Sequence, residues 1–165
     1  MKGIVKRIVK RAMPVAALVL LAGCGIQPSG VTTRGEAPTG VARGVTLYFV
    51  DAHERLRPQL RRTGRLGTIS QALAALLSWP AGSGMHTEIK STGVTQVVVT
   101  STPKVITLMV PLAAGEVTRL GIDQIVCTAL GVHVQHGGST RTKVRVRFTL
   151  PTPKSDERRT CPLIS

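Results

Sequence analysis

The alternation of apolar and polar positions predicts a strand hairpin at the start of a folded domain. Val45–Val50 is rich in β-branched and aromatic residues and is followed by the polar residues 51–54, so it predicts a buried first strand. Leu56–Arg62 is expected to return beside it as a second strand. Pro58 restricts that second strand to an edge or a bulge, because proline cannot donate to a strand ladder.

A helical pattern follows between Thr68 and Ser78. Thr68 and Gln71 have the spacing of a capping box, and Pro80 predicts the end of the helix because the residue before a proline is held out of the helical conformation. The apolar stripe of this helix is expected to pack on the core rather than to form a partner groove or a membrane-surface face. The stripe consists of Ile69, Ala72, Leu73, Leu76 and Leu77.

Residues 113–130 predict a second helix, in which Gly121 is a candidate break and Gly131 a suitable end. Strands are predicted at 86–89, 94–100 and 105–110 before this helix, and at 143–148 after it. The last of these runs alternates strictly, so one set of side chains is expected to face the core and the other to face solvent. The inward set is Val144, Val146 and Phe148, and the outward set is Lys143, Arg145 and Arg147.

The order of these elements predicts a single α+β domain over residues 45–150, followed by a tail, residues 151–165. Two strands, a helix, two or three strands, a helix and a last strand fit a small, mostly antiparallel sheet with both helices packed on one face. Residues 24–44 lack an apolar period and are rich in Gly, Pro, Ser and Thr. They predict a flexible tether, with packing of part of it as an edge strand as the alternative.

The first 23 residues follow the plan of a secretory signal, with five positive residues, the apolar run 13–21 and small residues at the end. The apolar run is too short to span a bilayer. Cys24 follows Leu-Ala-Gly, and this pattern resembles the lipobox of bacterial lipoproteins, in which that cysteine is acylated, by palmitate for example, and becomes the new N-terminus. The resemblance implies anchoring at the outer face of the cytoplasmic membrane. An ordinary signal with an incidental cysteine is the alternative.

The charge narrows the choice of partners. Five positive charges of the formal +14 lie in the signal, which leaves about +9 for a mature chain of 142 residues. Such a basic surface favours anionic lipid, acidic envelope polymers or acidic proteins. Nucleic acid is not expected, because the chain is exported and its few aromatic residues cannot form a stacking platform. We therefore expect contact with membrane lipid through the acylated N-terminus and with an envelope protein or an anionic polymer.

Two basic clusters are candidates for that contact. They provide either a contact surface for anionic groups or solvated faces that prevent edge-to-edge strand pairing. The candidate residues are Arg57, Arg61, Arg62 and Arg65 before the first helix, and Lys143, Arg145 and Arg147 on the last strand.

Cys127 and Cys161 form an even pair once Cys24 is lipidated, which predicts a disulfide in an oxidising compartment. This bridge is expected to pin the C-terminal tail to the second helix. The alternative, a nucleophilic or metal-binding thiol, has little support because neither cysteine has a neighbour at ligand spacing. The sequence contains no catalytic motif, so we predict no catalytic residue, no metal ligand and no cofactor. An active site assembled from distant residues stays open.

Three segments carry a resemblance to a known family. Tyr48–Asp51, Thr107–Pro111 and Gly121–Thr128, together with the leucine-rich helix that ends at Trp79-Pro80, resemble the GerMN domain of sporulation and spore germination proteins and of Gram-positive lipoproteins. The resemblance covers about residues 45–148. It implies an extracytoplasmic α+β domain that binds ligands or partner proteins without a known enzymatic role. The expected function is a lipid-anchored, non-catalytic binding module; the alternative is an envelope enzyme or accessory factor that acts on cell-wall polymers.

Overall fold

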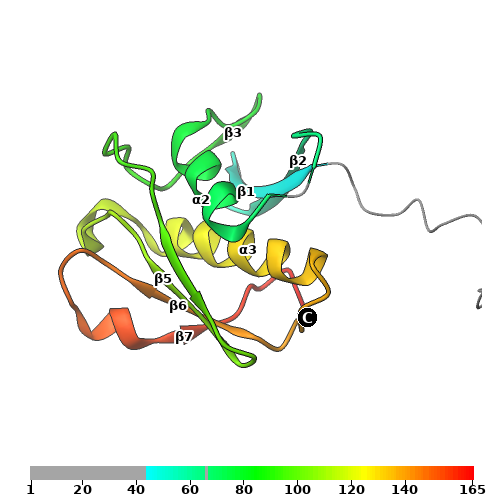
Figure 1. Ribbon diagram of the computed structural model, residues 1–165. Helices are drawn as coiled ribbons and strands as arrows, with labels where there is room; N and C mark the ends of the chain where they lie inside the picture. Colours follow the sequence, from blue (N-terminus) through cyan, green and yellow to red (C-terminus); the bar gives the residue numbers. More distant parts are fainter. Residues whose placement is uncertain (1–43, 66) are drawn as a thin grey trace, which may run out of the picture. The chain divides into compact units, whose positions relative to one another are not determined.

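The computed structural model describes residues 44–65 and 67–165, in which helices and strands pack around one hydrophobic core (Figure 1). The predicted signal, Cys24 and the predicted tether up to residue 43 lie outside the described residues. A three-stranded sheet has the order β2-β1-β3, and a four-stranded sheet has the order β4-β5-β6-β7. The predicted α+β class is confirmed, whereas the strands form two sheets rather than one.

The elements have the following bounds. The strands are β1 (Val45–Asp51), β2 (Leu56–Arg61), β3 (Met85–His86), β4 (Val98–Ser101), β5 (Val105–Met109), β6 (Lys143–Arg147) and β7 (Arg158–Arg159). The α-helices are α2 (Ile69–Ser78) and α3 (Arg119–Gln135), and the short 3-10 helices are η2 (Ala114–Glu116) and η3 (Pro153–Asp156).

The hairpin of β1 and β2 confirms the first sequence prediction. The two strands pair antiparallel from Val45 opposite Arg61 to Val50 opposite Leu56. Pro58 lies on β2, an edge strand, so its missing N–H removes no bond from the ladder.

Helix α2 begins with the predicted capping box. The Thr68 hydroxyl accepts a hydrogen bond from the Gln71 backbone N–H at 3.2 Å, and the Thr68 N–H donates to Gln71 Oε1 at 2.9 Å. The helix ends at Ser78, directly before Trp79-Pro80. Within its apolar stripe, Ala72, Leu73 and Leu76 are buried, which confirms that the stripe faces the core.

Helix α3 begins six residues later than predicted and ends five residues later, because Gly131 does not end it. An added Cβ at Gly131 would lie 3.4 Å from Cε2 of Tyr48, an ordinary contact distance, so this glycine is not required by its surroundings. Gly121 is not a break either. An added Cβ there would overlap the backbone carbonyl of Glu88, so this glycine lets the helix approach the chain that follows β3. Neither glycine ends the helix, and only Gly121 serves close packing.

Helix α3 lies in the middle of the domain, between the two sheets (Figure 1). It contacts β1 of one sheet, β6 of the other, and α2. The chain also uses α3 to cross from β5 to β6, which pair in parallel. A parallel pair requires such a crossover, because two neighbouring parallel strands cannot be joined by a tight turn. The helix therefore separates the strands into two sheets that share one core.

The later strands are shorter than predicted. Strand β3 contains two residues, and Ile89 then makes an isolated bridge to Val117. Strand β4 begins at Val98 rather than at Val94, whose side chain is exposed. The predicted alternation on β6 is confirmed on the inward side, where Val144, Val146 and Phe148 are buried.

On the side of β1 that faces away from β2, side chains rather than a full strand provide partners for the backbone groups. Strand β3 pairs only with the last two residues of β1, so Tyr48 has no strand partner on that side. The Tyr48 N–H instead donates to Thr128 Oγ1 at 3.2 Å, and its carbonyl accepts from Gln124 Nε2 at 2.9 Å. Gln124 Oε1 also accepts from the Glu88 N–H at 2.8 Å. Gln124 and Thr128 are fully buried, and they satisfy the backbone groups that β3 leaves unpaired.

A disulfide joins Cys127 of α3 to Cys161 of the tail, with the two Cα atoms 4.7 Å apart. This confirms the pairing that the cysteine count predicted. Residues 158–159 of the tail pair with β6 as the edge strand β7. No helix in the described part of the chain is both long and apolar enough to cross a membrane.

Candidate functional site: a basic hollow at the end of the four-stranded sheet

The predicted basic residues fall into two separate groups. Arg57 and Arg61 lie on β2 of the three-stranded sheet, and the exposed side chains of Arg62 and Arg65 follow that strand. Lys143, Arg145 and Arg147 lie on β6 of the four-stranded sheet. The seven side chains therefore belong to two parts of the domain, and each part has its own neighbours.

The group on β2 is largely occupied by contacts within the domain. Arg57 Nε lies 2.8 Å from Asp51 Oδ2, and Arg61 Nη2 donates to the Pro80 carbonyl at 2.8 Å. The guanidinium of Arg61 also lies over the Phe49 ring, 5.7 Å from its centroid. These contacts hold the hairpin against α2 and the loop after it, so they give Arg57 and Arg61 a structural role.

Asp51 is the acidic partner in this group. The guanidinium of Arg57 holds the pKa of the Asp51 carboxyl well below its usual range, and this effect outweighs the opposing effect of partial burial. The backbone N–H groups of Arg55 and His53 donate to the same carboxylate and lower its pKa further. Asp51 therefore stays ionised and fixes the turn between β1 and β2.

On β6, Arg145 and Arg147 share an acidic partner. Asp156 Oδ1 lies 3.2 Å from Arg147 Nη2 and 4.0 Å from Arg145 Nε. This contact seats η3 beside β6 and partly neutralises the two arginines. Lys143, at the beginning of the strand, has a different environment.

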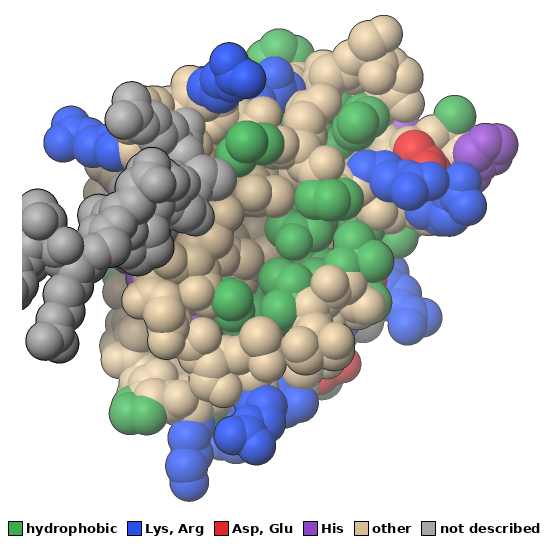
Figure 2. Space-filling view, turned by 90° about the vertical axis from the view of Figure 1, so that its right-hand side faces the viewer, with side chains coloured by type: hydrophobic (Ala, Val, Ile, Leu, Met, Phe, Trp, Pro, Cys, Tyr) green, Lys and Arg blue, Asp and Glu red, His purple; other side chains and the backbone are tan. Residues whose placement is uncertain are grey.

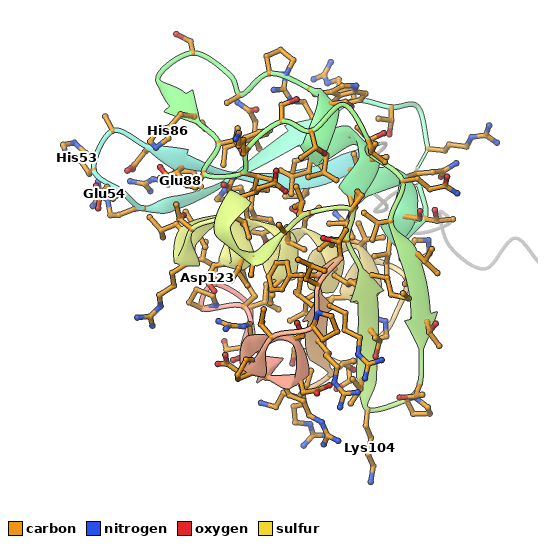
Figure 3. All side chains as sticks on the ribbon, turned by 90° about the vertical axis from the view of Figure 1, so that its left-hand side faces the viewer. His53, Glu54, His86, Glu88, Lys104 and Asp123 are labelled. Carbon is orange, nitrogen blue, oxygen red and sulfur yellow. A yellow bond between two sulfur atoms is a disulfide. The ribbon has the colours of Figure 1, made fainter. Side chains whose placement is uncertain are left out.

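Lys143 lines a hollow of about 450 Å³ together with three cations that come from other segments. Lys104 comes from the β4–β5 turn, Arg141 from the loop after α3, and Arg158 from β7. Ser139, Thr142, Pro103 and Val105 complete the lining. We call this the basic hollow. Figure 3 shows Lys104 at the tip of the β4–β5 hairpin, at the opposite end of the domain from His53.

The register of the four-stranded sheet places the residues of the basic hollow next to one another. Val105 pairs with Lys143 across the parallel β5–β6 ladder, and the Lys143 N–H donates to the Lys104 carbonyl at 3.0 Å. Arg158 pairs with Arg145 on the other side of β6, two residues along the strand from Lys143. Pairing on both sides of β6 therefore directs three segments to one end of the sheet.

The fourth segment, the loop from 139 to 142, is tied to α3 and folded on itself. The Thr142 N–H donates to the Ser139 carbonyl at 3.1 Å, and the Arg141 N–H donates to Ser139 Oγ at 3.2 Å. The side chain of Thr142 is buried, with Oγ1 3.1 Å from Nε2 of His133. These bonds hold Arg141 beside Lys143 without using its guanidinium.

The charge in the basic hollow is not balanced within the described residues. None of its four cations takes part in an ion pair found between described residues. The two acidic residues near β7, Asp156 and Glu157, pair with Arg147 and Arg159 instead. Like charges that converge without a carboxylate create a positive potential, which favours an anion in the space between them.

The sequence identified only Lys143 among these four cations. Lys104 lies in a predicted turn, Arg141 in a polar loop and Arg158 in the tail. No short motif connects them, because they are up to 54 positions apart in the chain. The parallel pairing of β5 and β6 is the signal that would have placed Lys104 beside Lys143, and the periodicity of the two strands does not reveal that pairing.

A second hollow, of about 290 Å³, contains charges of both signs. It lies between α3 and the tail, and its lining includes Arg119, Asp123, Glu157, Arg158 and Arg159, so Arg158 borders both hollows. Burial raises the pKa of the Asp123 carboxyl, and the neighbouring Arg159 and Arg119 oppose that effect. We call this the mixed-charge hollow.

Other polar groups are scattered. His86 Nε2 lies 3.0 Å from Glu88 Oε1, and His136 Nδ1 lies 2.8 Å from the Val132 carbonyl, so the histidines make separate local contacts. Among residues 44–65 and 67–165, no three His, Cys, Asp or Glu side chains are grouped so that they could hold a metal ion. Figure 2 shows hydrophobic side chains near the middle of one face, with Lys and Arg side chains around its outline.

Comparison with protein-family models, with curated proteins and with solved structures finds no match to this chain.

Proposed function

We propose that this protein is a lipid-anchored binding module at the outer face of the cytoplasmic membrane of a Gram-positive bacterium. Cys24, in its lipobox-like setting, provides the anchor, and the α+β domain binds an anionic envelope component without catalysing a reaction. The resemblance to the GerMN domain belongs to this proposal, because it implies the same location and the same kind of role.

The basic hollow is the observation that carries the proposal. Its cations come from four segments that the fold brings together, and the nearby carboxylates are paired elsewhere. Paired charges such as Arg57 with Asp51 stabilise the domain, whereas converging charges without such partners provide a binding surface for an anion.

Chemical crosslinking in the native envelope tests this proposal. The wild-type chain is compared with a hollow variant, Arg141→Gln with Lys143→Gln, and with a control, Arg62→Gln with Lys90→Gln. Each variant removes one Arg and one Lys charge at exposed positions, so their net charges are equal. We expect a captured envelope component that is lost in the hollow variant and kept in the control. Capture of nothing specific by the wild type would contradict the proposal.

A second candidate function is an envelope enzyme or accessory factor that acts on cell-wall polymers. The mixed-charge hollow favours it, because a carboxyl with a raised pKa beside a second carboxylate and three arginines is a feature of acid–base sites. Asp123→Asn distinguishes the two candidates. Loss of wall-polymer turnover without loss of folding would favour the enzyme, and unchanged turnover would leave Asp123 as a structural residue.

A further inference from the structure

We propose that the basic hollow is a binding site for a phosphate group, carried either by a lipid headgroup or by a free phosphate compound. This inference rests on the proposed binding function and names the chemistry of the ligand. The origin of the donors in four segments, the types of side chain and the size of the hollow support this inference.

The donors approach the hollow from four segments. Lys104 belongs to a turn, Arg141 to a loop, and Lys143 and Arg158 to two paired strands. Side chains from four segments can together supply many donors to one ligand. A tetrahedral phosphate has oxygens in several directions and can accept from all of them, whereas a planar carboxylate is satisfied by a single guanidinium.

The types of side chain also favour phosphate. Two guanidinium groups, two ammonium groups and the hydroxyl-bearing Ser139 line the hollow. Arginine forms bidentate hydrogen bonds to phosphate, lysine adds a point charge, and a serine hydroxyl can donate to a further oxygen.

The hollow is larger than one inorganic ion requires. Its volume of about 450 Å³ falls within the roughly 300–1,000 Å³ of small-molecule sites. The space beside the cations therefore accommodates the body to which a phosphate is attached. Val105 and Pro103 provide apolar contacts on that side.

Thermal unfolding of the full-length chain in a neutral detergent tests the assignment. Trp79 is the only tryptophan in the chain and is partly exposed, so its fluorescence reports unfolding. Inorganic phosphate is titrated at constant ionic strength, with succinate, a dianion that carries two separate planar carboxylates, for comparison. At phosphate concentrations about 100 times the Kd, we expect the unfolding midpoint to rise by roughly 5–10 °C, and we expect succinate to have little effect.

The same two variants distinguish a specific phosphate site from nonspecific electrostatic attraction to a basic surface. Arg141→Gln with Lys143→Gln is expected to lose the phosphate shift, and Arg62→Gln with Lys90→Gln is expected to keep it. Lys104→Gln, at the exposed tip of the hairpin, provides a second hollow variant if the first folds poorly. An equal loss in the control variant, or an equal shift with succinate, would overturn the assignment to this hollow or to phosphate.

Vesicles identify the source of the phosphate. The anchored chain is reconstituted in phosphatidylcholine vesicles with and without phosphatidylglycerol, and the unfolding midpoint is measured again. A rise that requires phosphatidylglycerol and the intact hollow would assign a lipid headgroup; a rise with inorganic phosphate alone would assign a free phosphate compound. No rise in either experiment would overturn the inference, while envelope capture that depends on the hollow would still support the proposed function.

Discussion

Gln124 connects three parts of the chain through one side chain. Its amide group donates to the Tyr48 carbonyl of β1 and accepts from the Glu88 N–H after β3, while its own backbone belongs to α3. A buried amide with both ends satisfied stabilises the fold, whereas removal of the amide leaves its partners desolvated and unpaired. The sequence did not reveal this role, because a polar residue on a helix indicates a solvent face when only periodicity is considered.

Gln124→Met is therefore expected to lower the free energy of unfolding by about 2–4 kcal/mol, because two backbone groups lose their partner at nearly constant side-chain volume. Chemical denaturation measures this change. Gln135→Met is the control on the same helix, since Gln135 donates one longer bond, 3.3 Å, to Thr46 Oγ1. Equal losses in both variants would contradict the special role of Gln124.

The two glycines of α3 predict opposite responses to the same substitution. Gly121→Ala is expected to destabilise the domain by about 1–3 kcal/mol, because the new methyl group overlaps the Glu88 backbone. Gly131→Ala is expected to be close to neutral, since its methyl group would lie at ordinary contact distance from Tyr48 and alanine favours the helix. Thermal unfolding of the two variants measures the difference. Equal behaviour would contradict the close approach at Gly121.

The Asp51 carboxyl predicts a loss of stability in acid. Arg57 lowers the pKa of Asp51 in the folded state below the unfolded value of about 3.9. The unfolded state therefore binds the proton first, so the stabilisation is present above about pH 4 and is lost as the pH falls further. Denaturation midpoints between pH 6 and pH 2 should fall more steeply for the wild type than for Asp51→Asn. Equal slopes for the wild type and Asp51→Asn would contradict this role of Asp51.

At the scale of the elements, α3 explains both the success and the limits of sequence-based prediction. Its partners are two sheets and a helix, so it is buried on almost all sides from Gly121 to Val132. A helix that is surrounded lacks a single apolar stripe, and its ends are therefore difficult to locate from periodicity. Helix α2 has one apolar face and a capping box, and its bounds were predicted within one residue.

The disulfide ties the tail to this central helix. Its two cysteines are 34 positions apart, and closing a loop of that length stabilises a domain by about 3–4 kcal/mol in the chain-entropy model. Cys127→Ala with Cys161→Ala should show a loss of this size in denaturation. In this double variant, the rate of amide hydrogen exchange should also rise more at Arg158 and Arg159 than on β5. The reason is that β7 then lies on a tail without its covalent link to α3. Equal exchange at both strands would indicate that β7 is held by other contacts.

For the whole molecule, the pattern of residues was sufficient for the fold class and insufficient for the site. Local signals identified the hairpin of β1 and β2, the cap of α2 and the alternation on β6. The parallel pairing of β5 with β6 depends on contacts across the crossover, and the basic hollow depends on that pairing. Lys104 became a neighbour of Lys143 only through that pairing.

The proposed lipid anchor is also tested on the whole molecule. Cys24→Ala is expected to abolish incorporation of radioactive palmitate, because the lipobox-like pattern provides its thiol as the acceptor. Cys127→Ala with Cys161→Ala should incorporate the label at the wild-type level, since those two sulfurs are joined to each other. Labelling of the Cys24→Ala chain would contradict the anchor.

Helix α3 covers the edge of β1 at Tyr48, and this cover matters when many copies of the chain lie close together. The edge at Tyr48 is open to strand addition from another copy unless Gln124 and Thr128 occupy it. Copies tethered to one membrane would meet far more often than copies in dilute solution, so an open edge there would favour intermolecular β-pairing. The two polar side chains on α3 are therefore expected to oppose aggregation. If the chain is anchored as proposed, their loss should increase aggregation more on a membrane than in dilute solution.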